Sequence, residues 1–502
     1  MSTAKKILGN TAVQVAGRAA MALISIAILK IITGFLGVEG YGMYSGVYEF
    51  LAFFGIAADL GLFTICVREM SKGEEDRNFI VGNIFGMRIG LAALMMMLAT
   101  VSIFFIPRYS GTPIPLGVAI SSLAVFLAIL QGTVSSVLQV ELKMQYATIG
   151  LVLGKVVNLA WMAGVVFLFY KGNPGDPAFY QLLWAGVFGN LASFLFTYHY
   201  ARKFAHVKPQ MNKAYWKKIF TTAVPYGLAL VMNMVYFRID GIMILFMKGP
   251  KELGFYSPSV RMLEILSVMA VYFMNSVLPV LTRKMKEGMA EAQRVAQMAF
   301  DFLYMVGLPM AVGLYLLSYS IIAMTTQPEF LSNIPAGIYG ADAALRILAF
   351  AMFFSYLNSL FTYSLLAVNK QNHLLWINGS AAIFNILANF LAIPGYGFRG
   401  AAFTSVLTEI FILGASYWIV RKHLNYHFNW GRLAKATVAA TAMAGVLVVL
   451  KEPVLAFAGL GSLNAIWLVG IGGLVYLFGL WLLGAIPEEF QGQLARFKLR
   501  RP

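Results

Sequence analysis

Seven basic side chains interrupt stretches that otherwise have the composition of membrane-spanning helices. A charge at the centre of a bilayer costs roughly 2.5–3.5 kcal/mol on insertion scales, so such residues normally face a partner or a water-filled cavity. Guanidinium and ammonium groups bind phosphate oxygens, and we predict that six of the seven line a cavity for an anionic diphosphate. These six are Arg18, Arg88, Lys155, Arg238, Arg261 and Arg346. The seventh, Lys30, lies near a span end, as do Arg238 and Arg346, where long side chains can instead reach the lipid head groups.

Acidic residues at similar depth are candidates for gating or for coupling to an ion: Glu49, Asp59, Asp240, Glu264 and Glu409. Arg261 and Glu264 are three residues apart on one helix, so they could neutralise each other. An internal repeat of 212 residues aligns Glu49 with Arg261, and we predict an ion pair between them across two lobes. Asp59 and Glu409 could bind a coupling ion or a proton, or serve only helix packing.

The elements that must position these side chains are membrane-spanning helices. The chain has 502 residues, of which 60% are apolar and 12% charged, whereas a soluble protein carries about 25% charged residues. Charge-free runs such as 109–140 and 453–487 are longer than the roughly 20 residues that cross a bilayer as a helix. We predict an all-α polytopic membrane protein with about 14 transmembrane helices. The runs are continuous rather than alternating, which excludes a barrel.

The net charge of +17 comes mainly from short segments between spans, which argues against nucleic-acid binding. If the spans alternate in direction, 25 of the bases fall on one side and six on the other. This asymmetry predicts a multi-pass protein of the cytoplasmic membrane with both termini in the cytoplasm. Cys66 is the only cysteine, so no internal disulfide can form. We expect no metal and no cofactor.

The two halves of the chain resemble each other. The tetrapeptide GMYS begins at Gly42, and GFYS begins at Gly254. Six spans per half give both halves the same orientation, which predicts a parallel repeat related by a pseudo-two-fold axis. We predict six-helix lobes at 1–201 and 219–421, a basic cytoplasmic linker at 202–218, and helices 13 and 14 with a basic tail at 422–502. The linker is either a solvated connector or a surface that recognises lipids.

The segment FLGVEGYGMYS at 35–45, followed by ADLGL at 58–62 and by Arg68-Glu69, is similar to the N-terminal signature of polysaccharide-repeat-unit flippases. The segments IDGIMI at 239–244 and LGFYS at 253–257, followed by Leu278-Pro279, resemble the same family. It is a lipid-linked oligosaccharide flippase family of the multidrug/oligosaccharidyl-lipid/polysaccharide exporter superfamily. The resemblance implies two lobes around a central cavity, and transfer of an undecaprenyl-diphosphate-linked oligosaccharide between leaflets by alternating access.

In the precursor flippases of that superfamily, cationic cavity residues lie on spans one, two and eight. Arg18 and Arg261 match this placement, whereas span two carries Glu49 and Asp59 instead. We therefore expect a monomeric flippase of cell-surface polysaccharide biosynthesis, and not an enzyme. Its expected partners are a lipid-linked sugar, membrane lipids and other polysaccharide-assembly proteins.

Two other functions stay open. A cation-coupled multidrug exporter of the same superfamily would need an acid-rich cavity, and acids at depth here nearly equal the bases. A membrane glycosyltransferase or polymerase would need a positioned acid or base. The chain offers no Asp-x-Asp motif and no long loop to hold one.

Overall fold

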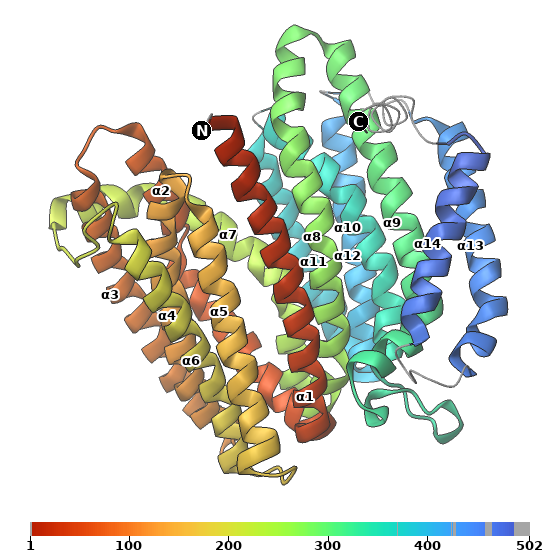
Figure 1. Ribbon diagram of the computed structural model, residues 1–502, viewed down its shortest axis with the longest axis horizontal. Coiled ribbons are helices and arrows are strands. Elements are labelled where there is room, and N and C mark those ends of the chain that lie inside the picture. The colour runs from red at the N-terminus through yellow and green to blue at the C-terminus, as the bar shows by residue number, and fades with distance from the viewer. Residues whose placement is uncertain (1–2, 369, 423, 425–427, 457–463, 486–502) are drawn as a thin grey trace, which may run out of the picture. The chain divides into compact units, whose positions relative to one another are not determined.

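The computed structural model describes residues 3–368, 370–422, 424, 428–456 and 464–485. These residues are mainly α-helical and form no β-strand (Figure 1). The α-helices are α1 (Thr3–Asp59), α2 (Leu62–Lys72), α3 (Arg77–Phe104), α4 (Ile114–Val140), α5 (Met144–Ala163), α6 (Asp176–Ala201), α7 (Lys213–Met247), α8 (Pro250–Glu287), α9 (Met289–Thr325), α10 (Ala341–Ala367), α11 (Gln371–Tyr396), α12 (Phe398–Val420), α13 (Trp430–Ala456) and α14 (Ala465–Leu482). Shorter helical turns are η1 (Pro107–Tyr109), η2 (Gly164–Phe169), η3 (Pro328–Phe330) and η4 (Ile334–Ala336).

The predicted fold class is confirmed. Among the described residues, 12 helical segments are long and apolar enough to cross a membrane. The first of them, Val13–Lys72, has 60 residues and contains a break at Gly37, where φ is 66°. A positive φ suits glycine, because it has no Cβ to collide with the backbone. With this segment counted as two and with α7 included, the described helices agree with the prediction of about 14 transmembrane helices.

The chain divides into two compact units, unit 1 (Met1–Gly254) and unit 2 (Phe255–Pro502). Unit 1 contains α1 to α7 and the first residues of α8. The predicted lobes assigned α7 to the second half, but in the structure α7 packs against α1, α2 and α3. The repeat-based lobe boundaries stay predictions. The basic tail after Ala485 lies outside the described residues.

In unit 1, helices α1, α4, α5 and α6 pack against one another, and α3 packs on α4 (Figure 1). When α1 is divided at Gly37 and its second half is taken together with α2, consecutive spans run in opposite directions (Figure 1), so their connections alternate between two ends. We call one the linker end, because it carries the α2–α3 turn and the 202–212 connection. The other is the corner end, which carries the Gly37 break, η1 and the α7–α8 corner. An ion pair between Arg77 and Glu141 joins two turns at the linker end.

At the corner end, the repeated glycines make a reciprocal contact. A Cβ on Gly42 would lie 1.8 Å from the carbonyl oxygen of Pro250, and a Cβ on Gly254 would lie 2.0 Å from that of Val38. The 212-residue offset relates Val38 to Pro250 as it relates Gly42 to Gly254. An exchange of equivalent contacts is what a two-fold axis between related segments produces. Glycine is required at both positions because the two backbones touch.

The η1 turn fastens the end of α7. Arg108 Nη1 donates to the carbonyl oxygen of Phe246 over 2.5 Å, and the Tyr109 hydroxyl donates to that of Leu245 over 2.9 Å. Both acceptors belong to the last turn of α7, whose carbonyls lack partners within the helix. Burial raises the pKa of Tyr109 to about 12, so its hydroxyl stays protonated at neutral pH. The turn between α7 and α8 is therefore attached to η1, and so to the rest of unit 1.

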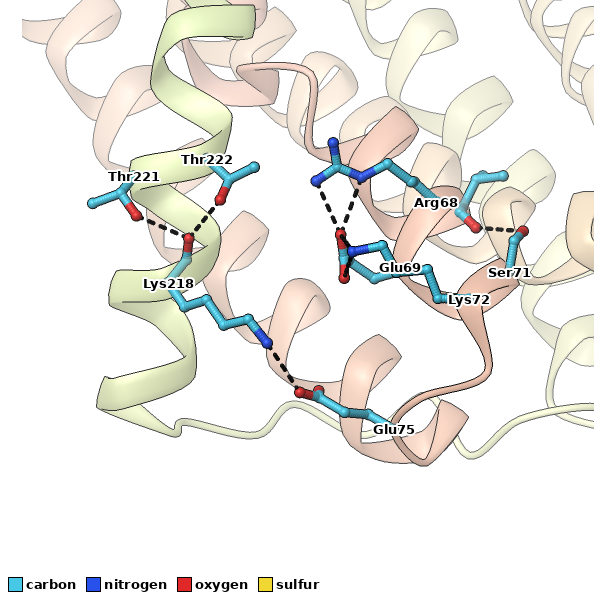
Figure 2. A network of polar contacts seen from close by, with 9 residues as sticks. Arg68, Glu69, Ser71, Lys72, Glu75, Lys218, Thr221 and Thr222 are labelled. Carbon is cyan, nitrogen blue, oxygen red and sulfur yellow. Dashed lines mark hydrogen bonds and ion pairs between the residues drawn. The ribbon is translucent and has the colours of Figure 1, made fainter.

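The 202–212 connection is packed rather than freely solvated. The backbone amide of Gln210 donates to the Gly82 carbonyl over 2.9 Å, and that of Asn212 donates to Asn83 Oδ1 over 2.7 Å. A Cβ on Gly86 would lie 2.4 Å from the Gln210 carbonyl oxygen. Figure 2 shows the polar network beside it, in which Lys218 of α7 pairs with Glu75 and in which Arg68 and Lys72 both pair with Glu69. The segment that leads into α7 is thus bound to α3, and Lys218 of α7 is bound to the α2–α3 turn.

In unit 2, α10 packs between α9 and α12, and α11 packs on α12. Helices α13 and α14 pack on each other and on α9, around a core that includes Met443 and Leu468. Arg432 at the start of α13 pairs with the fully buried Asp301 of α9 over 2.5 Å. The two C-terminal helices are therefore attached to the unit by a buried charge pair as well as by apolar contacts.

Candidate functional site

Arg88 is enclosed in unit 1. It lies on α3 with 2% of its surface exposed, and its guanidinium donates to the hydroxyl of Thr133 over 2.9 Å. The same guanidinium forms an ion pair with Asp59, which stands at the end of α1. Asp59 also accepts a hydrogen bond from the Gly61 amide. In this conformation, the buried Arg88 is neutralised by the partly exposed carboxylate of Asp59, and its charge is not presented to a ligand.

Arg238 is also paired within unit 1. Its Nη1 lies 2.9 Å from Glu49 Oε1, and the pair links α7 to α1. Both side chains are mostly buried, and Gly241 lies against the Glu49 side chain. Asp240, two residues after Arg238, is buried in the same stretch of α7. Glu49 thus has a partner in its own unit, and the pair predicted between Glu49 and Arg261 stays a prediction.

The ion pair between Arg261 and Glu264 that their spacing suggested is present. Arg261 Nη1 lies 2.8 Å from Glu264 Oε2 within α8, and both side chains are partly exposed. Glu409 of α12 is buried and accepts hydrogen bonds from the Asn358 side chain of α10 at its carboxylate and, over 3.0 Å, at its carbonyl. The Asn358 Oδ1 atom is buried and has no hydrogen-bond partner among the described residues.

Arg18 differs from these residues. It is exposed on α1, and it has no ion-pair or hydrogen-bond partner within the described part of the chain. Its neighbour Gly17 packs on α5, where a Cβ would lie 2.2 Å from Thr148 Cγ2. Lys155 is exposed on the same helix α5, about 10 Å further along its axis at 1.5 Å per residue. The α1–α5 pair therefore presents an uncompensated guanidinium with a second base nearby.

In unit 2, Arg346 of α10 resembles Arg18 in that it has no acid partner among the described residues. Its Nε lies 3.4 Å from the hydroxyl of Ser318, and its guanidinium carbon lies 5.6 Å from the ring centre of Tyr315. No acid pairs with it among the described residues. Sequence reasoning named Arg346 but missed Thr133, Ser318 and Asn358. Hydroxyl and amide residues are common in helices, and only the packed structure distinguishes these three.

The structure therefore sorts the charged candidates by availability. Three bases have carboxylate partners: Arg88, Arg238 and Arg261. Arg18 and Arg346 have no acid partner among the described residues. An unpaired guanidinium on a membrane-spanning helix is a suitable group for an anionic ligand, because it forms forked hydrogen bonds with phosphate oxygens.

Comparison with solved structures identifies the class of fold. The chain is similar to the lipid II flippase MurJ in an inward closed conformation, with a TM-score of 0.71 at 14% identity, over 94% of this chain and 98% of that one. It is also similar to an inward-facing multidrug resistance MATE family transporter of the MOP superfamily, with a TM-score of 0.65 at 12% identity, over 82% and 97% of the two chains. The protein has the polytopic fold that these transporters share.

The family follows from the sequence. Residues 7–285, more than half of the chain, match the family described as polysaccharide biosynthesis protein. The chain belongs to this family. An uncharacterized membrane protein of Methanocaldococcus jannaschii is 24% identical over 321 residues, which are 64% of this chain and 60% of that protein. The matched part of this chain thus spans less than two thirds of that relative.

Proposed function

We propose that the protein is a flippase that moves a polyprenyl-diphosphate-linked oligosaccharide across the cytoplasmic membrane by alternating access, in the biosynthesis of a cell-surface polysaccharide. Membership of the polysaccharide biosynthesis family and similarity in fold to a lipid II flippase support this proposal. The structural observation that carries it is the uncompensated guanidinium of Arg18 on the exposed face of α1. A diphosphate cannot cross hydrocarbon unassisted, and a guanidinium can replace part of its hydration.

Two candidate bases that have no acid partner among the described residues favour an anionic substrate over a cationic one. The acids Glu49, Asp59 and Glu264 each pair with an arginine. Asp301 pairs with Arg432, and Asp342 accepts hydrogen bonds from the amide and the hydroxyl of Ser332. Arg18 and Arg346 lack acid partners among the described residues. Similarity to a multidrug resistance transporter makes a cation-coupled drug exporter the second candidate, and that function would require unpaired acids instead.

The test is leaflet-resolved transport of a labelled polyprenyl-diphosphate oligosaccharide in vesicles that contain the purified protein. We expect Arg18→Ala to slow transport by about tenfold, because it removes a charge-assisted contact worth roughly 1.5–3 kcal/mol. Arg18→Lys should retain part of the rate. Lys171→Ala, which removes an exposed base from the α5–α6 turn, is the matched control and should transport as the wild type does.

Two results would contradict the proposal. In one, wild-type protein leaves the labelled lipid in its original leaflet but moves a cationic dye, which supports the drug exporter. In the other, Arg18→Ala and Lys171→Ala transport the lipid at the wild-type rate, which removes Arg18 from the site.

A further inference from the structure

One turn of α9 in unit 2 lies between two basic side chains from different helices. From α10, Arg346 reaches Ser318 and the ring of Tyr315. From α13, Lys451 Nζ donates to the Leu316 carbonyl oxygen over 3.3 Å. Neither base has an acid partner among the described residues, and Glu452, next to Lys451, pairs with neither of them. Two positive charges therefore flank a short stretch of helix without compensation.

The helical geometry places exposed tyrosines between the two bases. Successive residues of an α-helix turn by about 100°, so Ser318 and Leu316 lie on opposite sides of Tyr315 and Tyr319. Tyr315 is 42% exposed and Tyr319 is 43% exposed. The sides that face the rest of unit 2 are covered, because Leu317 and Ser318 are buried. We use the name α9 groove for the surface that these four residues form, with the exposed Tyr315 and Tyr319 between Arg346 and Lys451.

We propose that the α9 groove binds the glycosyl diphosphate head of the lipid-linked sugar, with Arg346 and Lys451 on the phosphates and Tyr319 against the first sugar ring. This inference rests on the proposed function and specifies where the head group binds. Two bases from separate helices suit two adjacent phosphoryl groups. An exposed aromatic ring beside them offers a flat apolar face to a pyranose. The head group of a glycerophospholipid such as phosphatidylglycerol carries phosphate but no ring, so the tyrosines favour the sugar-bearing lipid.

The groove lies near one end of its helices. Tyr319 is about 9 Å from the end of α9 at Thr325, at 1.5 Å per residue. Arg346 lies within the first two turns of α10, and Lys451 lies within the last two turns of α13. A head group bound there would be near the bilayer surface while its polyprenyl chain stays in lipid. The groove is thus placed to hold a head group as it enters or leaves the membrane interior.

The experiment measures binding to the full chain in nanodiscs with two probes. One is a short-chain polyprenyl diphosphate that carries one N-acetylhexosamine, and the other is the same lipid without the sugar. Arg346→Gln and Lys451→Gln should each weaken both probes by about tenfold, because each removes a charge-assisted contact. Tyr319→Leu should weaken only the sugar-bearing probe, by about fivefold, because ring stacking is worth roughly 1 kcal/mol. Arg346→Lys should keep most of the affinity for both.

The chain supplies matched controls in unit 2, because Arg399 and Tyr339 form a second arginine–tyrosine pair that is not part of the groove, with the guanidinium carbon 3.5 Å from the ring centre. Arg399→Gln and Tyr339→Leu should bind both probes as the wild type does. Wild-type affinities in all groove variants, or displacement of the probes by phosphatidylglycerol at equal concentration, would overturn the proposal. If wild-type protein shows groove-dependent binding but transports no lipid, the proposed function fails and the groove stands. If transport occurs and no groove variant changes binding, only the groove is rejected.

Discussion

At the residue scale, the sign and depth of a charge do not determine its role. Arg88 and Arg18 are both arginines well inside predicted spans, yet one is enclosed with Asp59 and the other is exposed and unpaired among the described residues. A buried ion costs several kcal/mol unless a counter-charge and hydrogen bonds compensate it. Arg88 has both, from Asp59 and Thr133. We infer that Arg88 stabilises unit 1, and that Arg18 is available to a ligand.

The Asp59–Arg88 pair should respond asymmetrically to removal of either partner. The Asp59 side chain is 29% exposed, whereas that of Arg88 is 3% exposed. Asp59→Asn strands a buried cation and should cost about 3 kcal/mol, whereas Arg88→Met leaves a carboxylate that solvent can reach and should cost less. Thermal unfolding of the purified variants measures this. The double variant should be more stable than Asp59→Asn alone, and equal losses in the two single variants would contradict the assignment.

At the element scale, contacts between backbones position the helices of unit 1. Gly42 and Gly254 each leave room for a carbonyl of the other segment, and this explains why the repeated motif begins with glycine. A side chain at either position would force the start of α8 away from α1. The corner end is also fastened by Arg108 and Tyr109 to the last turn of α7. Two independent contacts thus hold the α7–α8 corner on unit 1.

Gly42→Ala should destabilise unit 1, because its Cβ would lie 1.8 Å from the Pro250 oxygen and backbone atoms cannot rotate away. Overpacking of this kind costs roughly 1–3 kcal/mol. Gly90→Ala on α3 is the control, since a Cβ there meets nothing within 4 Å. That variant should be neutral or slightly more stable, because alanine has the higher helix propensity. The midpoints of thermal unfolding compare the two, and a Gly42→Ala midpoint as high as that of Gly90→Ala would refute the close contact.

At the scale of the whole molecule, the basic connection at 202–212 belongs to unit 1, and it attaches the start of α7 to that unit. Hydrogen bonds from Gln210 and Asn212 to α3 hold the connection in place. It contains exposed bases at which trypsin could cut, Arg202 and Lys203. Cleavage requires a stretch of chain to leave the surface, so a packed segment is protected. The connection should therefore be resistant to trypsin in the folded protein.

Gly86→Ala should remove this protection. The added Cβ would lie 2.4 Å from the Gln210 carbonyl oxygen, so the connection must shift. A destabilisation of about 1.4 kcal/mol raises the population of the open segment, and hence the cleavage rate, about tenfold. Gly90→Ala, one turn along α3, is the control and should be cut at the wild-type rate. Equal cleavage of the two variants after Lys203 would show that α3 does not hold the connection.

The sequence predicted the positions of the helices far better than it predicted which charged side chains pair between them. Charge-free runs such as 109–140 reveal spans because the thickness of a bilayer sets a local length. The pairing of Glu49 with Arg238 joins residues 189 positions apart, and only helix packing decides it. The spacing of Arg261 and Glu264 did predict their pair, because both lie on one helix. The sequence showed which basic residues could contact a substrate, but it did not show which of them lack an acid partner in the folded protein.

The only cysteine of the chain, Cys66, is fully buried in unit 1 and accepts a hydrogen bond from the Ser136 hydroxyl over 3.2 Å. A thiol without solvent contact reacts poorly with maleimides and methanethiosulfonates, because these reagents cannot reach the sulfur. Cysteines introduced at exposed sites, one per unit, would then be the only thiols that take up a spin label or a fluorophore. The natural chain is therefore ready for distance measurements during turnover, with no preliminary cysteine-free variant.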